Sequence, residues 1–99
     1  MKMKFLVTFP DSQSIGLIFD EKEEKLIVGG YCRTSQQMIS ILNDYFGTKN
    51  CNRSEHVGLN KIRIKKHIDS QTFIRGLKDM KKSLSLTIEP VRSFGRLMR

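Results

Sequence analysis

The stretch Asn60-Lys61-Ile62-Arg63-Ile64-Lys65-Lys66-His67-Ile68 alternates cationic and apolar residues. This alternation predicts a half-buried strand, because successive side chains of a strand point to opposite faces. The isoleucines then share the buried face, and the cations on the opposite face are Lys61, Arg63 and Lys65. Lys66 falls on the isoleucine side, so we expect it at the end of the strand or at a bulge. Such a strand offers a fixed row of positive charge to an anionic partner.

Alternation also predicts strands over residues 3–9, 14–20 and 83–88, the last of which Pro90 ends. The apolar residues Leu26, Ile27 and Val28 predict a third strand over 25–29. Turn residues at Pro10–Ser12 and an acidic run at Asp20–Glu24 separate the first three strands. Residues 47–59 show no period and predict the longest loop.

Two amphipathic helices separate the later strands. The first helix opens at Thr34 as N-cap and ends at Gly47, and its apolar stripe is Met38, Ile41, Leu42, Tyr45 and Phe46. The second opens at Asp69 or Ser70, and its stripe is Phe73, Ile74, Leu77 and Met80.

The predicted order is therefore β-β-β-α-β-α-β. Since amphipathic helices bury their stripes against a sheet, we predict a two-layer α+β fold with one mainly antiparallel sheet and two helices on one face. We predict that residues 1–90 form a single α+β domain and that 91–99 form a basic C-terminal tail. The pattern does not identify an edge strand, so it predicts no oligomeric state.

The net charge of +8 is unevenly distributed. Residues 1–50 hold six Lys/Arg and six Asp/Glu, so the whole excess lies in residues 51–99. Such asymmetry favours a polyanionic partner, and nucleic acid is the leading interpretation. We predict a small basic protein that binds DNA or RNA without catalysis, through phosphate contacts from a basic strand, a helix and the tail. The predicted contact residues are Lys61, Arg63, Lys65, Lys66, Arg75, Lys78, Lys81, Lys82, Arg92, Arg96 and Arg99.

These cations act together only if their elements share a face. The last-turn lysines of the second helix also have a structural reason, because they complement the negative end of the helix dipole. Arginines beside Phe94 in the tail would suit stacking on unpaired bases. No recognition-helix, zinc-finger or RNP pattern is present, so no base specificity is predicted.

Two other classes remain open. A virus- or plasmid-type inhibitor or adaptor would dock its basic surface onto an acidic host protein. A small ribonuclease toxin would use His56 beside Glu55 as an acid–base pair, or Cys51 with His56 as a thiolate–imidazole pair. No group is visible that would orient the histidine, so the sequence favours a protein that is not an enzyme.

The sequence predicts no metal and no cofactor. Cys32, Cys51, His56 and His67 are four potential zinc ligands, but none is paired at the spacing of a structural zinc site. Two cysteines are too few for a disulfide framework. The apolar run after Met1 ends at Thr8 and is too short for a signal peptide, and no segment is long enough to span a membrane. We therefore expect a cytoplasmic protein with reduced thiols and no membrane partner.

Residues 31–80 resemble part of a LAGLIDADG homing-endonuclease half. The resemblance lies in a helix ending Ile41-Leu42-Asn43-Asp44-Tyr45-Phe46-Gly47-Thr48, a loop, the strand Lys61-Ile62-Arg63-Ile64 and the helix segment Phe73-Ile74-Arg75-Gly76-Leu77. In that family the sheet forms a saddle over DNA, which would give the basic strand a role. The defining motif helix, which packs the dimer and brings the metal-binding acid, is missing here. The last strand and the arginine tail also depart from the pattern, so the resemblance implies a DNA-binding relative without nuclease activity.

Overall fold

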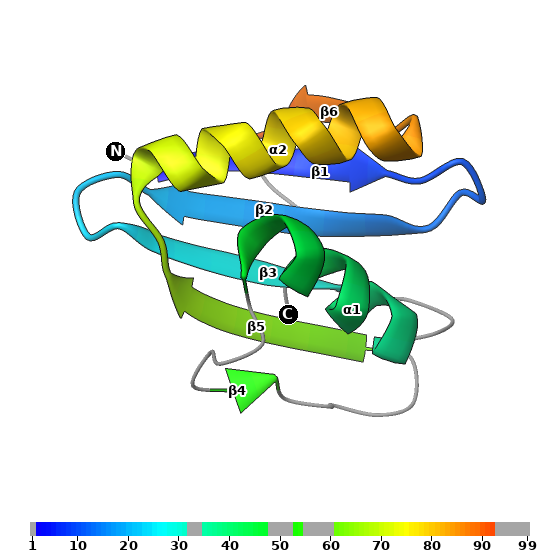
Figure 1. Ribbon diagram of the computed structural model, residues 1–99, viewed down its shortest axis with the longest axis horizontal. Helices are drawn as coiled ribbons and strands as arrows, with labels where there is room; N and C mark the ends of the chain where they lie inside the picture. Colours follow the sequence, from blue (N-terminus) through cyan, green and yellow to red (C-terminus); the bar gives the residue numbers. More distant parts are fainter. Residues whose placement is uncertain (1, 32–34, 48–52, 55–60, 93–99) are drawn as a thin grey trace.

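A computed structural model describes residues 2–31, 35–47, 53–54 and 61–92 and shows a two-layer α+β fold (Figure 1). Its elements are β1 (Lys2–Thr8), β2 (Ser14–Asp20), β3 (Lys25–Tyr31), α1 (Ser35–Phe46), β4 (Arg53–Ser54), β5 (Lys61–His67), α2 (Ser70–Leu84) and β6 (Thr87–Pro90). The predicted order β-β-β-α-β-α-β is confirmed. The short strand β4 is an addition that lies within the predicted 47–59 loop.

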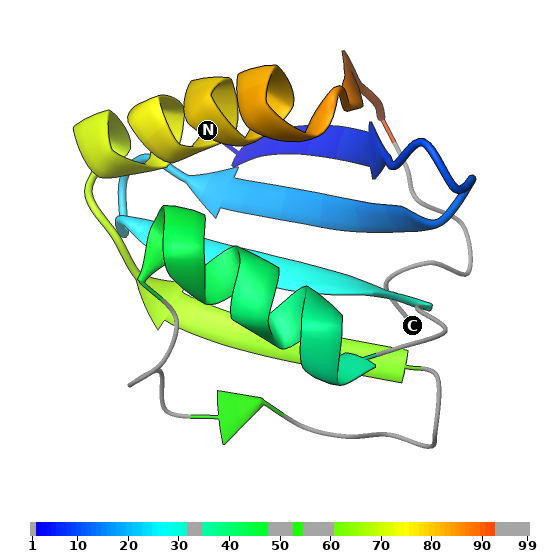
Figure 2. The ribbon, with the colours of Figure 1, turned by 45° about the vertical axis from the view of Figure 1, so that its right-hand side comes forward.

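The strands form one sheet in the order β4-β5-β3-β2-β1-β6, and every neighbouring pair is antiparallel. In the sequence, helix α1 lies between β3 and β5, and these two strands are neighbours in the sheet. Helix α2 carries the chain from β5 across the sheet to β6, which pairs with β1 (Figure 1). Both helices lie on the same face of the sheet, as predicted (Figure 2).

The two hairpin turns use the residues that the sequence marked. In the first turn the Phe9 carbonyl accepts a hydrogen bond from Ser12 N–H at 2.9 Å, and Ser12 adopts a φ of 74°. In the second, the Asp20 carboxylate accepts bonds from the backbone N–H groups of Lys22 (3.0 Å) and Glu23 (3.2 Å). These local bonds set the register in which β1, β2 and β3 pair.

The core is centred on Phe73 of α2, which is 1% exposed. Its ring stacks on Phe19 of β2 with centroids 4.4 Å apart and planes 6° apart, and Phe46 of α1 lies 5.9 Å away. These three rings join the sheet to both helices, and aromatic pairs of this kind contribute about 0.5–1.5 kcal/mol beyond their area burial. The helices add the fully buried Leu42 and Met80, and the four long strands add Val7, Ile15, Leu17, Leu26, Val28, Ile62 and Ile64.

The helices meet where α2 carries a glycine. A Cβ at Gly76 would collide with the backbone carbonyl oxygen of Tyr45 and would lie 2.9 Å from ring atoms of Phe46. The absence of a side chain therefore lets the end of α1 pack directly against α2. Gly47, with a φ of 65°, ends α1 as the expected C′ residue, and its N–H bonds to the Asn43 carbonyl at 2.9 Å.

Two predicted details of the second half are wrong. Ile74 is 44% exposed and does not belong to the buried stripe, because it lies about 100° around the helix from Phe73. Helix α2 also runs to Leu84, so the last strand begins at Thr87 and not at residue 83. Leu84 continues the α2 stripe one turn beyond Met80, and Ser85 then ends the helix in the left-handed region. The predicted N-cap Thr34 lies outside the described residues.

Candidate nucleic-acid interface

Strand β5 places its cations as the alternation predicts. Ile62 and Ile64 are each 1% exposed and face the helices, whereas Arg63 and Lys65 are exposed on the opposite face. Lys61 takes the matching register position, opposite Tyr31 of β3. Successive positions on this face are about 7 Å apart, so the strand spaces its charges evenly.

We call the side of the sheet that neither helix covers the helix-free face. The register fixes which residues lie on it. Across β1, β2, β3 and β5, one row contains Lys4, Ile18, Ile27 and Lys65. The row on one side contains Lys2, Asp20, Lys25 and His67, and the row on the other contains Leu6, Gly16, Gly29 and Arg63. Arg53 of β4 is paired with Lys65 and so extends the first row.

The helix-free face is strongly basic. The strands β1, β3 and β5 bring five lysines and arginines to it, in addition to the register position of Lys61: Lys2, Lys4, Lys25, Arg63 and Lys65. Two carboxylates accompany them, Asp20 on β2 and Glu89 on β6. The Glu23 N–H, and more weakly the Lys22 N–H and the charge of Lys2, hold the pKa of Asp20 below its ordinary 3.8. Asp20 therefore offsets part of the charge at one end of the face, and Glu89 lies at the β6 end of the row that contains Arg63. Among the described residues, no carboxylate is the direct strand partner of Arg63 or Lys65.

Sequence reasoning missed Lys2, Lys4 and Lys25, because the first half of the chain carries no net charge. Most of the compensating acids lie elsewhere: Glu21, Glu23 and Glu24 are exposed in the β2–β3 turn. The signal that would have found Lys2 and Lys4 is the alternation of β1, whereas Lys25 lies at the start of β3. In β1, Lys2 and Lys4 alternate with the apolar Met3 and Phe5, so cations and apolar residues are on different faces of the strand. Arg63 and Ile62 alternate in the same way in β5.

Lys66 is separated from the other β5 cations. It pairs with Leu26, whose side chain is buried under the helices, so it lies on the helix side of the sheet. The register runs unbroken from Lys61 to His67, so there is no bulge, and Lys66 is instead the penultimate residue of the strand.

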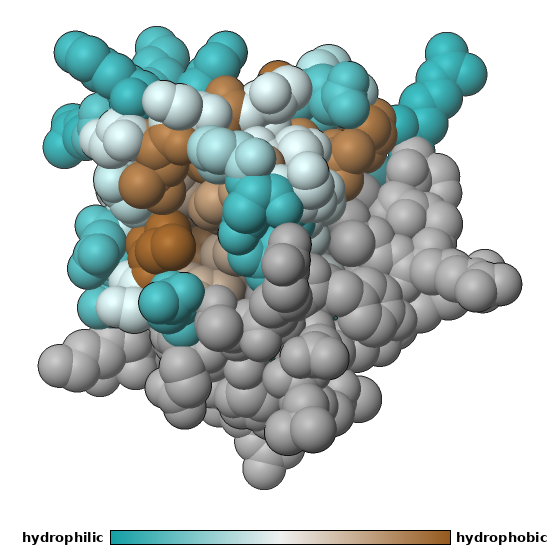
Figure 3. All heavy atoms as spheres, turned by 90° about the vertical axis from the view of Figure 1, so that its right-hand side faces the viewer, coloured by the Kyte–Doolittle hydropathy of each residue, from teal (hydrophilic) through white to brown (hydrophobic). Residues whose placement is uncertain are grey.

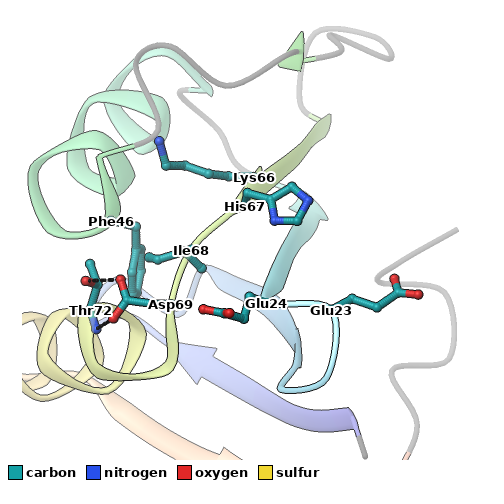
Figure 4. Close-up of a pocket in the computed structure, with 8 residues that line it drawn as sticks. All are labelled: Glu23, Glu24, Phe46, Lys66, His67, Ile68, Asp69 and Thr72. Atoms are coloured by element: carbon teal, nitrogen blue, oxygen red, sulfur yellow. Dashed lines mark hydrogen bonds between the residues drawn. The ribbon is translucent and has the colours of Figure 1, made fainter.

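Lys66 borders a surface hollow of about 500 Å³ between the β2–β3 turn, the end of β5 and the ends of both helices (Figure 4). Phe46 and Ile68 form its apolar part, and Glu24 and Asp69 bring carboxylates. Asp69 is already engaged as the N-cap of α2, accepting bonds from the Thr72 N–H (3.1 Å) and hydroxyl (2.6 Å). Because the hollow is lined by Lys66 as well as by the carboxylates of Glu24 and Asp69, its charge favours neither an anionic nor a cationic ligand.

The α2 cations lie on the other side of the molecule from the β5 cations. Arg75, Lys78, Lys81 and Lys82 are all exposed. Because α2 packs Phe73 and Met80 down onto the sheet, its exposed side chains point outward from the helix layer. Hydrophilic side chains project from the upper part of the molecule, where α2 lies (Figure 3). Among the described residues, the exposed cations of β5 and α2 therefore lie on different sides of the molecule.

Arg92 is exposed just beyond β6, and its carbonyl oxygen accepts a hydrogen bond from Lys4 Nζ at 3.3 Å. This contact brings the start of the tail beside a lysine of the helix-free face. Arg96, Arg99 and Phe94 lie outside the described residues.

The residues considered for metal binding or catalysis fall mostly outside the described ranges, which exclude Cys32, Cys51, Glu55 and His56. His67 is exposed at the end of β5, in the same row as Lys25. Within the described ranges, no group of three His, Cys, Asp or Glu side chains is placed to hold a metal ion. Neither α1 nor α2 has the length and apolar content needed to cross a bilayer.

Comparisons with protein-family models, curated proteins and solved structures find no match for this chain. The resemblance of residues 31–80 to a homing-endonuclease half therefore rests on its sequence elements alone.

Proposed function

We propose that the protein binds nucleic acid through phosphate contacts on the helix-free face. The observation that supports this is the register, which gathers lysines and arginines from three strands separated in sequence onto one surface. Each cation that neutralises a phosphate releases condensed counterions, and this release drives association. The binding is non-catalytic and has no base specificity of its own.

Among the described strand positions of the face, the register places one Phe, Tyr or Trp residue, Tyr31 opposite Lys61, so phosphate contacts outnumber positions for stacking on bases. Between the cations lie aliphatic residues and two glycines, Gly16 and Gly29, which face each other on β2 and β3. Phe5, Phe19, Phe46 and Phe73 are committed to the core on the other side of the sheet. Sequence-tolerant stacking needs aromatic rings beside the strand, and these rings are not available for it.

The homing-endonuclease resemblance, if it reflects kinship, would put DNA on this same side of the sheet. An acidic protein partner remains the competing interpretation, because it would meet the same charges.

The test compares two charge-reversal pairs on opposite sides of the molecule. Arg63→Glu with Lys65→Glu changes the helix-free face, and Arg75→Glu with Lys78→Glu makes the same change in net charge on α2. We expect the first pair to weaken binding to a short duplex at least tenfold in low salt. It should also reduce the slope of log affinity against log salt by about two, since two phosphate contacts are lost.

The α2 pair should weaken one-to-one binding much less, because charges on α2 are largely screened from a duplex bound at the helix-free face. Equal losses for both pairs would show that net charge and not the helix-free face determines binding. Absence of binding by the unmodified protein, together with a salt-resistant protein partner in a nuclease-treated pull-down, would favour the adaptor interpretation.

A further inference from the structure

We propose that the outer surface of α2 is a second phosphate-binding surface, so that one molecule joins two segments of nucleic acid. This inference rests on the proposed function, which supplies the first segment at the helix-free face. It starts from the finding that the cations of β5 and α2 are exposed on opposite sides of a two-layer domain.

The α2 cations form a stripe. Positions 75, 78 and 82 lie within about 60° of one another around the helix axis at 100° per residue, and they span about 10 Å along it at 1.5 Å per residue. Phe73, Gly76 and Met80 occupy the opposite side of the helix, which is buried. The stripe is therefore held outward by the packing of α2.

Part of this stripe is not explained by the helix dipole, although exposed Asp79 lies four residues after Arg75 and offsets part of the charge. Lys81 and Lys82 are in the last turn, where they complement the negative end of the helix dipole. Arg75 and Lys78 precede that turn and gain nothing from it. The neighbouring helix does not extend the charge, because the exposed residues of α1 include Asp44 and Ser40. The second surface is thus confined to α2.

The thickness of the molecule allows both surfaces to be occupied at once. The layers stack along the shortest axis, down which Figure 1 is viewed, and the extent along that axis is 26 Å. The Debye length is about 8–10 Å at 0.1–0.15 M salt, so a polyanion on one side is largely screened from a polyanion on the other. A second duplex can then approach α2 without strong repulsion from the first.

The experiment measures first binding and bridging separately. A duplex is tethered to beads, the protein is added, and capture of a second, fluorescent duplex of the same sequence is recorded. The variants are Arg75→Gln with Lys78→Gln on α2 and Arg63→Gln with Lys65→Gln on β5, which remove the same charge. We expect the α2 variant to remain on the beads while its capture of the second duplex falls on the order of tenfold. The β5 variant should bind the tethered duplex more weakly, since the α2 surface then carries most of the binding, and its capture of the second duplex should fall as well.

Three outcomes would contradict the proposal, and they differ in what else they affect. If the unmodified protein binds the tether but captures no second duplex, bridging is wrong and the proposed function stands. If the α2 variant captures as well as the unmodified protein, a protein dimer or the helix-free face alone makes the bridge. If the unmodified protein does not bind the tether, the proposed function fails first.

Discussion

At the scale of single residues, Gly76 decides how closely the two helices approach. Its missing side chain is what lets the Tyr45 carbonyl and the Phe46 ring pack against α2. Glycine normally disfavours a helix by about 1 kcal/mol relative to alanine, so its presence in the middle of α2 needs such a packing reason. Sequence reasoning did not single out this glycine, since a helical period shows which side is buried and not what packs there.

We expect Gly76→Ala to destabilise the fold despite the better helix propensity of alanine. The new methyl group meets a backbone carbonyl, which cannot move as a flexible side chain can, and overpacking of this kind costs about 1–3 kcal/mol. The free energy of unfolding from urea titration checks this. Ser83→Ala, at an exposed site of the same helix, is the control and should be neutral or slightly stabilising. An alanine variant at 76 that matched the unmodified protein would show that the helix contact is looser than described.

At the scale of elements, the start of α2 depends on an ionised cap. The Asp69 carboxylate accepts hydrogen bonds from the Thr72 hydroxyl and N–H. These bonds hold the pKa of Asp69 below its ordinary 3.8, and the bond from the hydroxyl has the larger effect. The pKa is lower in the folded than in the unfolded chain. The stabilisation is therefore fully present above the unfolded value and is lost as the pH falls through the folded one.

We accordingly expect Asp69→Asn to remove one component of the acid sensitivity. Asparagine keeps the capping bond but does not titrate, so the stability advantage of the unmodified protein should shrink as the pH is lowered from 7 to 3. Thermal unfolding of both proteins across that range measures the difference. Glu21→Gln removes an exposed carboxyl that caps no helix and should leave the pH profile nearly parallel. If the stability of the unmodified protein relative to Asp69→Asn increased as the pH fell, the proposed role of Asp69 as an ionised cap would be wrong.

Most of the fold was predictable because its elements carry clean periods. The alternation of β5 predicted that Arg63 and Lys65 would share a face, and the stripe of α1 was confirmed at Met38, Leu42 and Phe46. The boundary between α2 and β6 was not predicted, since Leu84 and Leu86 fit an alternating strand as well as the end of a helix. The structure distinguishes the two, since Leu84 packs against the core from the last turn of α2 and Ser85 then adopts the left-handed conformation.

The candidate site was predicted in part. Strand order decides that Lys4 lies in the same row as Lys65, and no local pattern encodes that order. The separation of the α2 and β5 cations, in contrast, was implicit in the sequence. A helix that buries Phe73 must pack on the isoleucine face of β5, so Arg63 must lie on the other side.

At the scale of the whole molecule, repulsion among the cations of the helix-free face lowers the stability of the folded protein. A net charge of +8 on 99 residues leaves a repulsion that salt can screen. Raising the ionic strength from 0.01 to 0.15 M shortens the Debye length from about 30 to about 8 Å. We therefore expect the melting temperature of the free protein to rise over this range. Arg63→Gln with Lys65→Gln should raise the melting temperature in low salt and reduce the further gain from salt. A melting temperature that fell with salt would mean that attractive pairs dominate the surface.

The pairing of β6 with β1 joins the two most distant strands of the sequence, with Thr8 opposite Thr87 and Phe5 opposite Pro90. During synthesis β1 is made first, and it can pair with β6 only after the end of the chain has been made. At about 5–20 residues per second, the edge of β1 is exposed for several seconds on every ribosome. The chain therefore cannot close its sheet before its last strand has emerged, and in this interval nascent chains are most open to pairing with one another.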